Sequence, residues 1–269
     1  MNTGVKKIDV FIADGVQTIE LNDPPANTYS YEMMRELDEA VLAARMNSDV
    51  HVIVIRGAGE KFFCAGANIG MLKDADPDFK YYFCLHANET LARLEQTPKL
   101  VVAALNGHTV GGGLEVALAA DIRIAKRDAG RIGLPEVALG VLPGTGGTQR
   151  LARLVGKARA IELMATGRLL TMDEAKTAGL VHEVWGDAEI GAGSFAEAVH
   201  AYARQFTPPN KASRAVGRMK RAVQSGAEAG LLEGLAIERE LQQLLFQSED
   251  AKEGIAAHVE KRKARFTGR

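Results

Sequence analysis

The chain has 269 residues, 46% of them hydrophobic and 25% charged, and its formal net charge is −1. This is the composition of a globular protein that is long enough to bury a large core. Its 33 basic and 34 acidic residues nearly cancel, which argues against nucleic-acid binding through a general electrostatic field.

The first part of the chain predicts strands around one helix. Residues 8–12 and 17–21 alternate in polarity on either side of Asp14-Gly15, which is typical of a β-hairpin. Apolar side chains at helical spacing between residues 33 and 44 predict a helix. The β-branched run 51–56 then predicts a buried strand that enters a glycine-containing loop, which continues to residue 69.

The next part repeats this order. Residues 78–96 read as a helix that stops before Pro98, and 100–105 as a second buried strand. That strand runs into a glycine cluster, a helix follows over 115–120, and 121–125 reads as a strand. Strand, glycine turn and helix thus occur twice, which indicates an α/β fold.

From residue 149 onward the pattern is almost entirely helical. Pro208-Pro209 precedes three amphipathic helices predicted over 212–224, 231–246 and 251–265. We therefore divide the chain into a core, 1–207, and a helical C-terminal region, 208–269, that serves as a second lobe or an oligomer contact. The basic residues of this region are interpreted as solvated helix faces. They include Lys211, Arg214, Arg218, Lys220 and Arg221.

No apolar run is long enough to span a membrane, and residues 1–11 lack the apolar core of a signal peptide. Cys64 and Cys84 are the only cysteines, too few for a disulfide framework, so a reducing compartment fits best. We expect the bacterial cytoplasm, or the mitochondrial matrix if a transit peptide has been removed.

Two glycine-rich segments each place a carboxylate beside a turn. Gly111-Gly112-Gly113 precedes Glu115, and Glu136 precedes 144–147. Backbone N–H groups of Gly112 and of Ala67, in the other glycine loop, are candidates for an oxyanion hole. Paired carboxylates suit general acid and general base catalysis. The structural alternative is that the glycines only form tight turns and that the carboxylates only cap helix ends. Two pairs of a glycine turn and a carboxylate in one chain favour a functional site instead.

The sequence motifs of other catalytic chemistries are absent or incomplete. The histidines show no metal-ligand spacing, and no GxSxG elbow is present. The 144–147 segment lacks the lysine of a P-loop. Cys64 lies next to the predicted pocket, but no base neighbours it in sequence, so a nucleophile role is disfavoured.

Five segments together are specific to one family, namely 63–69, 106–115, 134–136, 140–151 and 259–263. In these segments the chain resembles the crotonase (enoyl-CoA hydratase/isomerase) superfamily over nearly its full length. The resemblance implies a spiral of repeated ββα units followed by a helical region that builds trimers, which often pair into hexamers. It implies an acyl-CoA thioester substrate, with no metal and no cofactor apart from the coenzyme A of the substrate.

The resemblance also implies roles for individual residues. Ala67 and Gly112 fall on the oxyanion-hole positions, and Glu115 and Glu136 on the two catalytic glutamates of hydratases. Gly144 falls on a glycine whose N–H helps to hold the water. The implied substrate contacts also include Ala65, Asn68, Ile69 and Lys261.

Three residues depart from the family pattern, all toward the coenzyme A end. Asn68 stands where aspartate is frequent, Gly70 where lysine is frequent, and His258 where an aromatic residue is frequent. The segment 27–31 is unusually aromatic, and it either shapes the substrate channel or packs in the core.

We expect a 2-enoyl-CoA hydratase that adds water in the syn sense, with Glu115 as base and Glu136 as acid. The alternatives within the fold are an enoyl-CoA isomerase, a hydratase for branched or cyclic substrates, and a hydratase-lyase. A non-catalytic RNA-binding member of the fold is the alternative of another class. The near-neutral charge and the presence of both glutamates argue against it.

Overall fold

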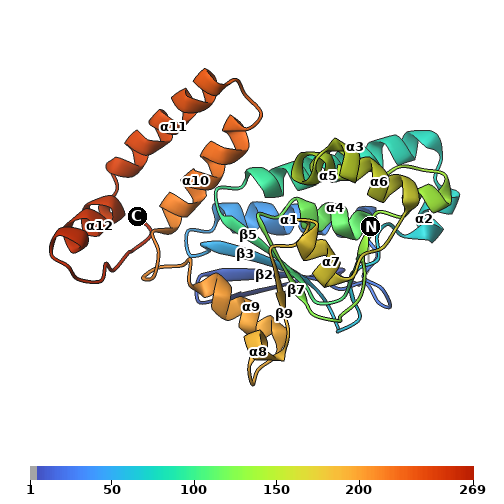
Figure 1. The fold of residues 1–269 in the computed structure, drawn as a ribbon, viewed down its shortest axis with the longest axis horizontal. Helices are drawn as coiled ribbons and strands as arrows, with labels where there is room; N and C mark the ends of the chain where they lie inside the picture. Colours follow the sequence, from blue (N-terminus) through green and yellow to red (C-terminus); the bar gives the residue numbers. More distant parts are fainter. Residues whose placement is uncertain (1–4) are drawn as a thin grey trace.

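The computed structural model describes residues 5–269. The predictions for the core, 1–207, and for residues 1–11 therefore extend over four residues that lie outside the described part. A sheet-containing body carries helices on both sides, and the last three helices extend from one end of it (Figure 1). No helix in the part of the chain that the structure describes is long and apolar enough to cross a membrane.

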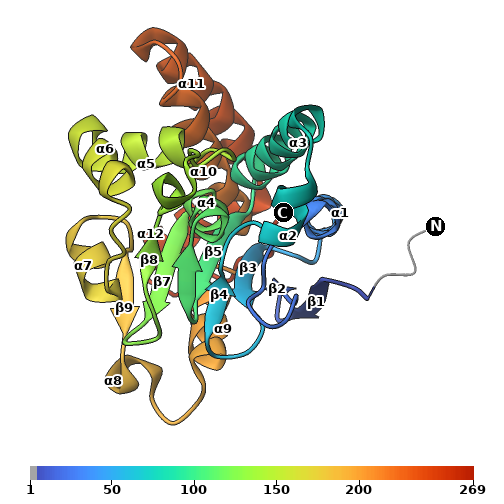
Figure 2. The ribbon, with the colours of Figure 1, turned by 90° about the vertical axis from the view of Figure 1, so that its right-hand side faces the viewer.

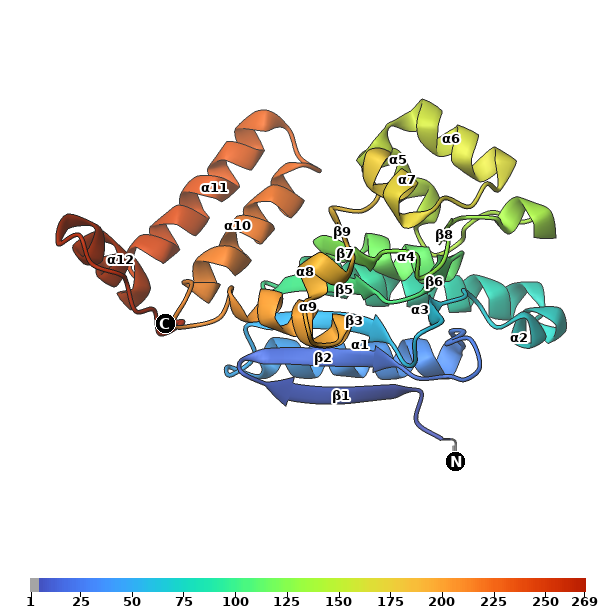
Figure 3. The same ribbon diagram turned by 60° about the horizontal axis from the view of Figure 1, so that its bottom comes forward.

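The main sheet has six strands in the order β1-β2-β3-β5-β7-β9, and Figure 3 shows them one above another from β1 upward. The first two strands form the predicted hairpin, and its turn residues Asp14 and Gly15 have φ of 53° and 77°. All other neighbours in this sheet are parallel. The strands are β1 (Ile8–Ala13), β2 (Val16–Leu21), β3 (Val52–Gly57), β5 (Leu100–Leu105), β7 (Ile122–Lys126) and β9 (Glu183–Trp185).

A second, three-stranded parallel sheet has the order β4-β6-β8. Its strands are β4 (Phe62–Cys64), β6 (His108–Val110) and β8 (Ile132–Gly133). Each follows a strand of the main sheet, so β3-β4, β5-β6 and β7-β8 are successive turns of a spiral (Figure 2). The predicted spiral of ββα units is confirmed. Reading 57–69 as a loop was wrong, because β4 lies within it.

Helices cover both faces of the main sheet. On one side lie α1 (Tyr31–Met46) and α3 (Pro77–Gln96), and the apolar stripe predicted for α1 is buried at Met33, Leu37, Val41 and Ala44. On the other side α9 (Phe195–Arg204) packs on the central strands through Phe195, Val199 and Ala203. The shorter helices are α2 (Ile69–Asp74), α4 (Gly112–Leu118), η1 (Glu136–Leu139), α5 (Gly147–Val155), α6 (Lys157–Thr166), α7 (Met172–Thr177) and α8 (Asp187–Ile190).

The C-terminal region holds three helices, as predicted: α10 (Ser213–Gly226), α11 (Leu231–Phe246) and α12 (Glu249–Val259). The last ends earlier than the expected residue 265. Lys261 adopts a left-handed φ of 56°, and Arg262 turns back to form an ion pair with Glu253 at 2.7 Å. No residue of α11 is buried, and its large apolar side chains Leu231, Leu232 and Phe246 are exposed.

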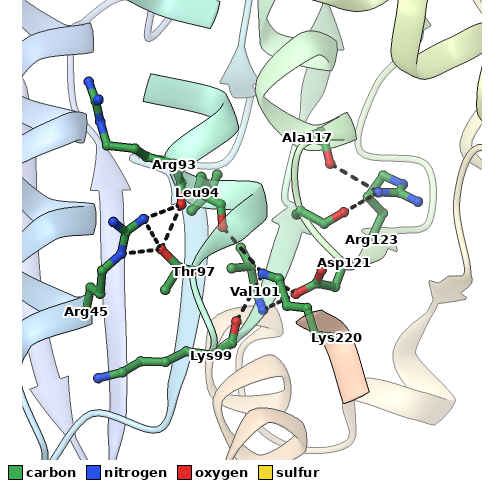
Figure 4. A network of polar contacts seen from close by, with 11 residues as sticks. Arg45, Arg93, Leu94, Thr97, Lys99, Val101, Ala117, Asp121, Arg123 and Lys220 are labelled. Atoms are coloured by element: carbon green, nitrogen blue, oxygen red, sulfur yellow. Dashed lines mark hydrogen bonds and ion pairs between the residues drawn. The ribbon is translucent and has the colours of Figure 1, made fainter. Parts of the chain in front are cut away.

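A buried ion pair attaches α10 to the body (Figure 4). Lys220 Nζ lies 2.9 Å from Asp121, whose carboxylate also accepts from Val101 N–H at 2.7 Å. The same ammonium donates to the carbonyl of Lys99 at 3.1 Å. Interpreting all basic residues of this region as solvated was therefore wrong for Lys220, whose side chain is 4% exposed.

Candidate active site

A cavity of about 280 Å³ lies where the ends of the second-sheet strands meet the first turns of α2, α4 and η1. Five of the predicted site residues line it together with Glu136 and Glu115. They are Ala65, Ala67, Ile69, Gly112 and Gly144. Much of the remaining wall is apolar, formed by Leu72, Ala138, Leu139, Val141 and Leu142. The spiral thus brings residues from four separate segments to one pocket.

Both candidate oxyanion-hole residues, Ala67 and Gly112, line this cavity. Within residues 5–269, neither the Ala67 nor the Gly112 N–H donates a hydrogen bond. A Cβ on Gly66, next to Ala67, would lie 3.2 Å from the Gly112 nitrogen, so the two loops are in close contact. Amides without a protein acceptor are available to a ligand oxygen.

The glycines allow this close approach. Gly111 precedes α4 with φ of 58°, a region that glycine adopts readily. A Cβ on Gly112 would lie 1.9 Å from Tyr29 Cε1, and one on Gly113 would lie 2.1 Å from the Cys64 carbonyl oxygen. Side chains at these positions would therefore collide with the Tyr29 ring and with β4.

Glu115 is 2% exposed and its carboxylate is held by the segment that precedes α5. Oε1 accepts from the N–H groups of Thr145 at 2.8 Å and Gly147 at 2.7 Å. Oε2 accepts from the Thr145 hydroxyl. The carboxylate thus lies at the N-terminus of α5, where unpaired N–H groups and the helix dipole favour a negative charge. The glycine-rich segment 144–147 acts here as a carboxylate clamp.

Glu136 has a different environment. It begins η1, and its Oε2 is buried without a hydrogen-bond partner among the described residues. Burial raises the pKa of Glu136 to about 7, and the nearby charge of Glu115 adds to this, while its own backbone N–H and Lys80 act against it. Its carboxyl group lies over Gly111, where a Cβ would be 3.0 Å from Oε1. Glu115 thus accepts three hydrogen bonds from the protein, whereas Glu136 titrates near neutral pH.

Two of the predicted contacts, Asn68 and Lys261, are not among the residues that line the cavity. Asn68 caps α2, since its Oδ1 accepts from Met71 N–H at 3.0 Å, and it is not among the residues that line the cavity. Lys261 follows α12, which lies at the opposite end of the molecule from α2 (Figures 1 and 3). Gly144 lines the cavity, and its N–H has no acceptor within the described part of the chain.

Two residues of the site were not singled out from the sequence as site residues. Tyr29, within the aromatic segment 27–31, lines the cavity, whereas Tyr31 is half exposed beside His86. Thr145 contributes both its N–H and its hydroxyl to Glu115. The position of Thr145 between two glycines gave no sign of this, because the contact joins residues 30 positions apart.

Cys64 does not suit nucleophilic chemistry. Its side chain is fully buried, and burial raises its pKa to about 12, so the thiol stays protonated. Among the residues that the structure describes, no cluster of three or more histidine, cysteine, aspartate or glutamate side chains is arranged to hold a metal ion.

This spiral of ββα units, with free amides and two glutamates at one cavity, defines a crotonase-fold protein. A family model described as enoyl-CoA hydratase/isomerase matches residues 12–269. The chain belongs to this enoyl-CoA hydratase/isomerase family.

Similar proteins match almost the whole chain. The short-chain-enoyl-CoA hydratase of Clostridium acetobutylicum is 37% identical over 249 residues, which cover 92% of each chain. The enoyl-CoA hydratase structure from Geobacillus kaustophilus is 45% identical with a TM-score of 0.94, covering 99% of this chain and 98% of the other. The Bacillus anthracis enoyl-CoA hydratase structure is 34% identical with a TM-score of 0.90, covering 98% and 100%.

Proposed function

We propose that the protein is a 2-enoyl-CoA hydratase that adds water across the 2,3 double bond of an acyl-CoA thioester. The observation that supports this most is the difference between the two glutamates of one apolar cavity. A pair of carboxyl groups whose environments separate their protonation states is suited to act as base and acid in one step. A proton shuttle in an isomerase needs only one of them.

The free amides account for activation of the substrate. The N–H groups of Ala67 and Gly112 donate to the thioester oxygen, which gains negative charge as the enolate forms. That polarisation withdraws electrons from the double bond and makes the β-carbon electrophilic. Because the thioester itself supplies this activation, we propose that the reaction uses no metal or redox cofactor.

The glutamates then move two protons. Glu115 takes one proton from a water held with the help of the Gly144 N–H, while the water oxygen bonds to the β-carbon. The electrons of the double bond pass into the enolate, and the protonated Glu136 gives its proton to the α-carbon. Glu115 ends protonated and Glu136 ionised, and proton exchange with solvent restores both. The pKa of about 7 for Glu136 supports its role as the acid.

The dimensions of the cavity suit the reacting part of the substrate. A volume of about 280 Å³ lies just below the usual range for small-molecule sites, which begins at about 300 Å³. We propose that it encloses the thioester and the acyl group, whose tail contacts Leu139, Val141 and Leu142, while the nucleotide end of coenzyme A lies outside. Lys261 reaches coenzyme A only if a neighbouring subunit supplies it, so we also propose a trimer or a dimer of trimers. We propose the cytoplasm as its compartment.

A panel of thioesters tests the function. Crotonyl-CoA, longer 2-enoyl-CoA, 3-methylcrotonyl-CoA and a cyclic enoyl-CoA are each followed by loss of the conjugated double bond and by product analysis. We expect a 3-hydroxyacyl-CoA from at least one of them. Conversion of 3-enoyl-CoA to 2-enoyl-CoA without hydration of any substrate would instead support an isomerase. Salt-sensitive RNA binding without turnover would support the non-catalytic alternative.

A further inference from the structure

A chain of two hydroxyl groups lies behind Glu115. The Thr145 hydroxyl contacts Oε2 of Glu115, and the Tyr29 hydroxyl lies 3.1 Å from Thr145 Oγ1. The three residues come from separate segments, namely the loop before α1, the first turn of α4 and the loop before α5. All three side chains are buried.

The direction of these hydrogen bonds follows from the number of protons. An ionised carboxylate only accepts, so the single hydroxyl proton of Thr145 points to Glu115. Thr145 Oγ1 must then accept from Tyr29. Burial, together with the charge of Glu115, raises the pKa of Tyr29 well above its usual value, so the phenol keeps the proton that it donates. The chain therefore runs from Tyr29 through Thr145 to Glu115.

The hydrogen bonds leave one free position on the carboxylate. Each carboxylate oxygen has about two acceptor positions. Oε1 uses both of them for the N–H groups of Thr145 and Gly147, whereas Oε2 uses one for the Thr145 hydroxyl. The remaining acceptor position of Glu115 is thus on Oε2, the oxygen that the hydroxyl chain orients.

Tyr29 is itself fixed in place. Its ring stacks on Phe83 with centroids 5.7 Å apart, and Gly112 has no side chain where that ring lies. The residue also lines the cavity beside the amide of Gly112. A ring held on both sides leaves its hydroxyl little freedom to find another partner than Thr145.

We propose that Thr145 and Tyr29 are positioning residues that orient Glu115 so that Oε2 alone receives the proton of the attacking water. This inference rests on the proposed hydratase function and adds two residues to it. Thr145 acts directly on the carboxylate, and Tyr29 acts through Thr145. Loss of the Thr145 hydroxyl removes a hydrogen bond that favours the ionised base, so catalysis should then require a higher pH.

Other groups around Glu115 and the two hydroxyls set the background of this pH dependence. Glu136 on η1 lies near Glu115 and is itself influenced by Lys80 on α3, while Cys64 on β4 and Cys84 on α3 lie near Tyr29. Arg150 on α5 donates to the Thr145 carbonyl at 3.4 Å and pairs with Glu95. None of them is changed in the variants below.

The test compares variants that remove one hydroxyl with variants that keep it. Thr145→Val keeps the shape of the side chain, Thr145→Ser keeps the hydroxyl, and Tyr29→Phe removes one oxygen. Thr148→Ala and Tyr31→Phe are matched controls, because the Thr148 hydroxyl contacts Gln149 and Tyr31 lies beside His86. For each variant, kcat, KM and the pH dependence of kcat/KM are measured on the best 2-enoyl-CoA substrate, and folding is checked by circular dichroism.

We expect Thr145→Val to lower kcat by about 10- to 100-fold, the usual effect of losing a hydrogen bond to a charged group, with little change in KM. The acid limb of the pH profile of kcat/KM should move to higher pH by roughly one pH unit. Thr145→Ser should restore both quantities. Tyr29→Phe should move them in the same direction by a smaller amount, and the controls should match the wild type.

The inference is overturned if folded Thr145→Val or Tyr29→Phe keeps the wild-type acid limb, or if Thr145→Ser fails to restore it. Should Thr145→Val not fold, Tyr29→Phe and Thr145→Ser decide the question by the same criteria. Wild-type protein that hydrates none of the thioesters would refute the proposed function itself, which is a separate outcome.

Discussion

Raising the pH should lower the rate of hydration, because Glu136 then loses the proton that it donates. If its protonated form delivers the proton to the α-carbon, kcat/KM depends on the fraction of free enzyme in which Glu136 is protonated. With a pKa of about 7, that fraction is one half near pH 7 and falls about tenfold for each further pH unit. Roughly 1% of the plateau activity should remain at pH 9.

The assay is the pH dependence of kcat/KM from pH 5.5 to about 9 for the wild type, Glu136→Gln and Glu39→Gln, whose side chain is exposed on α1. Glu136→Gln should lose at least ~10²-fold in activity, and its residual rate should lack the basic limb. Glu39→Gln should behave as the wild type. A basic limb that persists unchanged in Glu136→Gln would refute the assignment of Glu136 as the acid.

The same pKa predicts a stability effect with a defined sign. The folded state holds the proton of Glu136 more tightly than the unfolded state, whose pKa is near the ordinary 4.5. The resulting stabilisation is complete below pH 4.5 and is lost as the pH rises toward 7. The free energy of unfolding of Glu136→Gln, relative to wild type, should therefore rise by about 1–2 kcal/mol between pH 5 and 8, with solvent at the pocket reducing the full effect. A constant difference across this range, measured by urea unfolding, would contradict the raised pKa.

Three further predictions concern the base, the amides and the assembly. Glu115→Gln should lower hydration at least ~10²-fold in steady-state assays while acyl-CoA binding, measured by calorimetry, survives; near-normal turnover would exclude Glu115 as the base. Gly112→Pro and Gly112→Ala both place a Cβ against Tyr29, but only proline removes the N–H, so the proline variant should be slower by a further 10²–10³-fold or so. Equal rates of these two variants, with folding checked by circular dichroism, would show that this amide is not part of the hole. The exposed apolar side chains of α11 predict a trimer or hexamer in light scattering, and a stable monomer at micromolar concentration would contradict this.

Long periodic segments of the sequence predicted most of the fold. The hairpin and the stripe of α1 follow from side-chain periodicity, and the buried strands β3 and β5 follow from unbroken apolar runs. The strands β4, β6 and β8 have only two or three residues each and lie beside glycine turns, so their alternation is too short to recognise. Their pairing comes from the winding of the spiral.

The candidate site was predictable where the family motifs fix the backbone. Ala67, Gly112, Glu115 and Glu136 meet at one cavity as those motifs imply. The contacts that link Tyr29 through Thr145 to Glu115 were not predictable, because they depend on how three distant segments pack.

Three other features have local or tertiary causes. The cap that Asn68 forms on α2 has a local signal, since asparagine before a helix commonly caps it, and its contact with the substrate stays a prediction. The early end of α12 and the burial of Lys220 depend on partners that are distant in the sequence, Glu253 for Arg262 and Asp121 for Lys220.

Product analysis in isotopically labelled water tests the central claim most directly. The protein is incubated with crotonyl-CoA in water enriched in heavy oxygen, and the thioester product is examined by mass spectrometry. Hydration predicts a product heavier by one labelled water, with the label at carbon 3, and loss of this product in Glu115→Gln and Glu136→Gln. Hydration would be contradicted if crotonyl-CoA and every other 2-enoyl-CoA gave only unlabelled thioester or an isomer without added water.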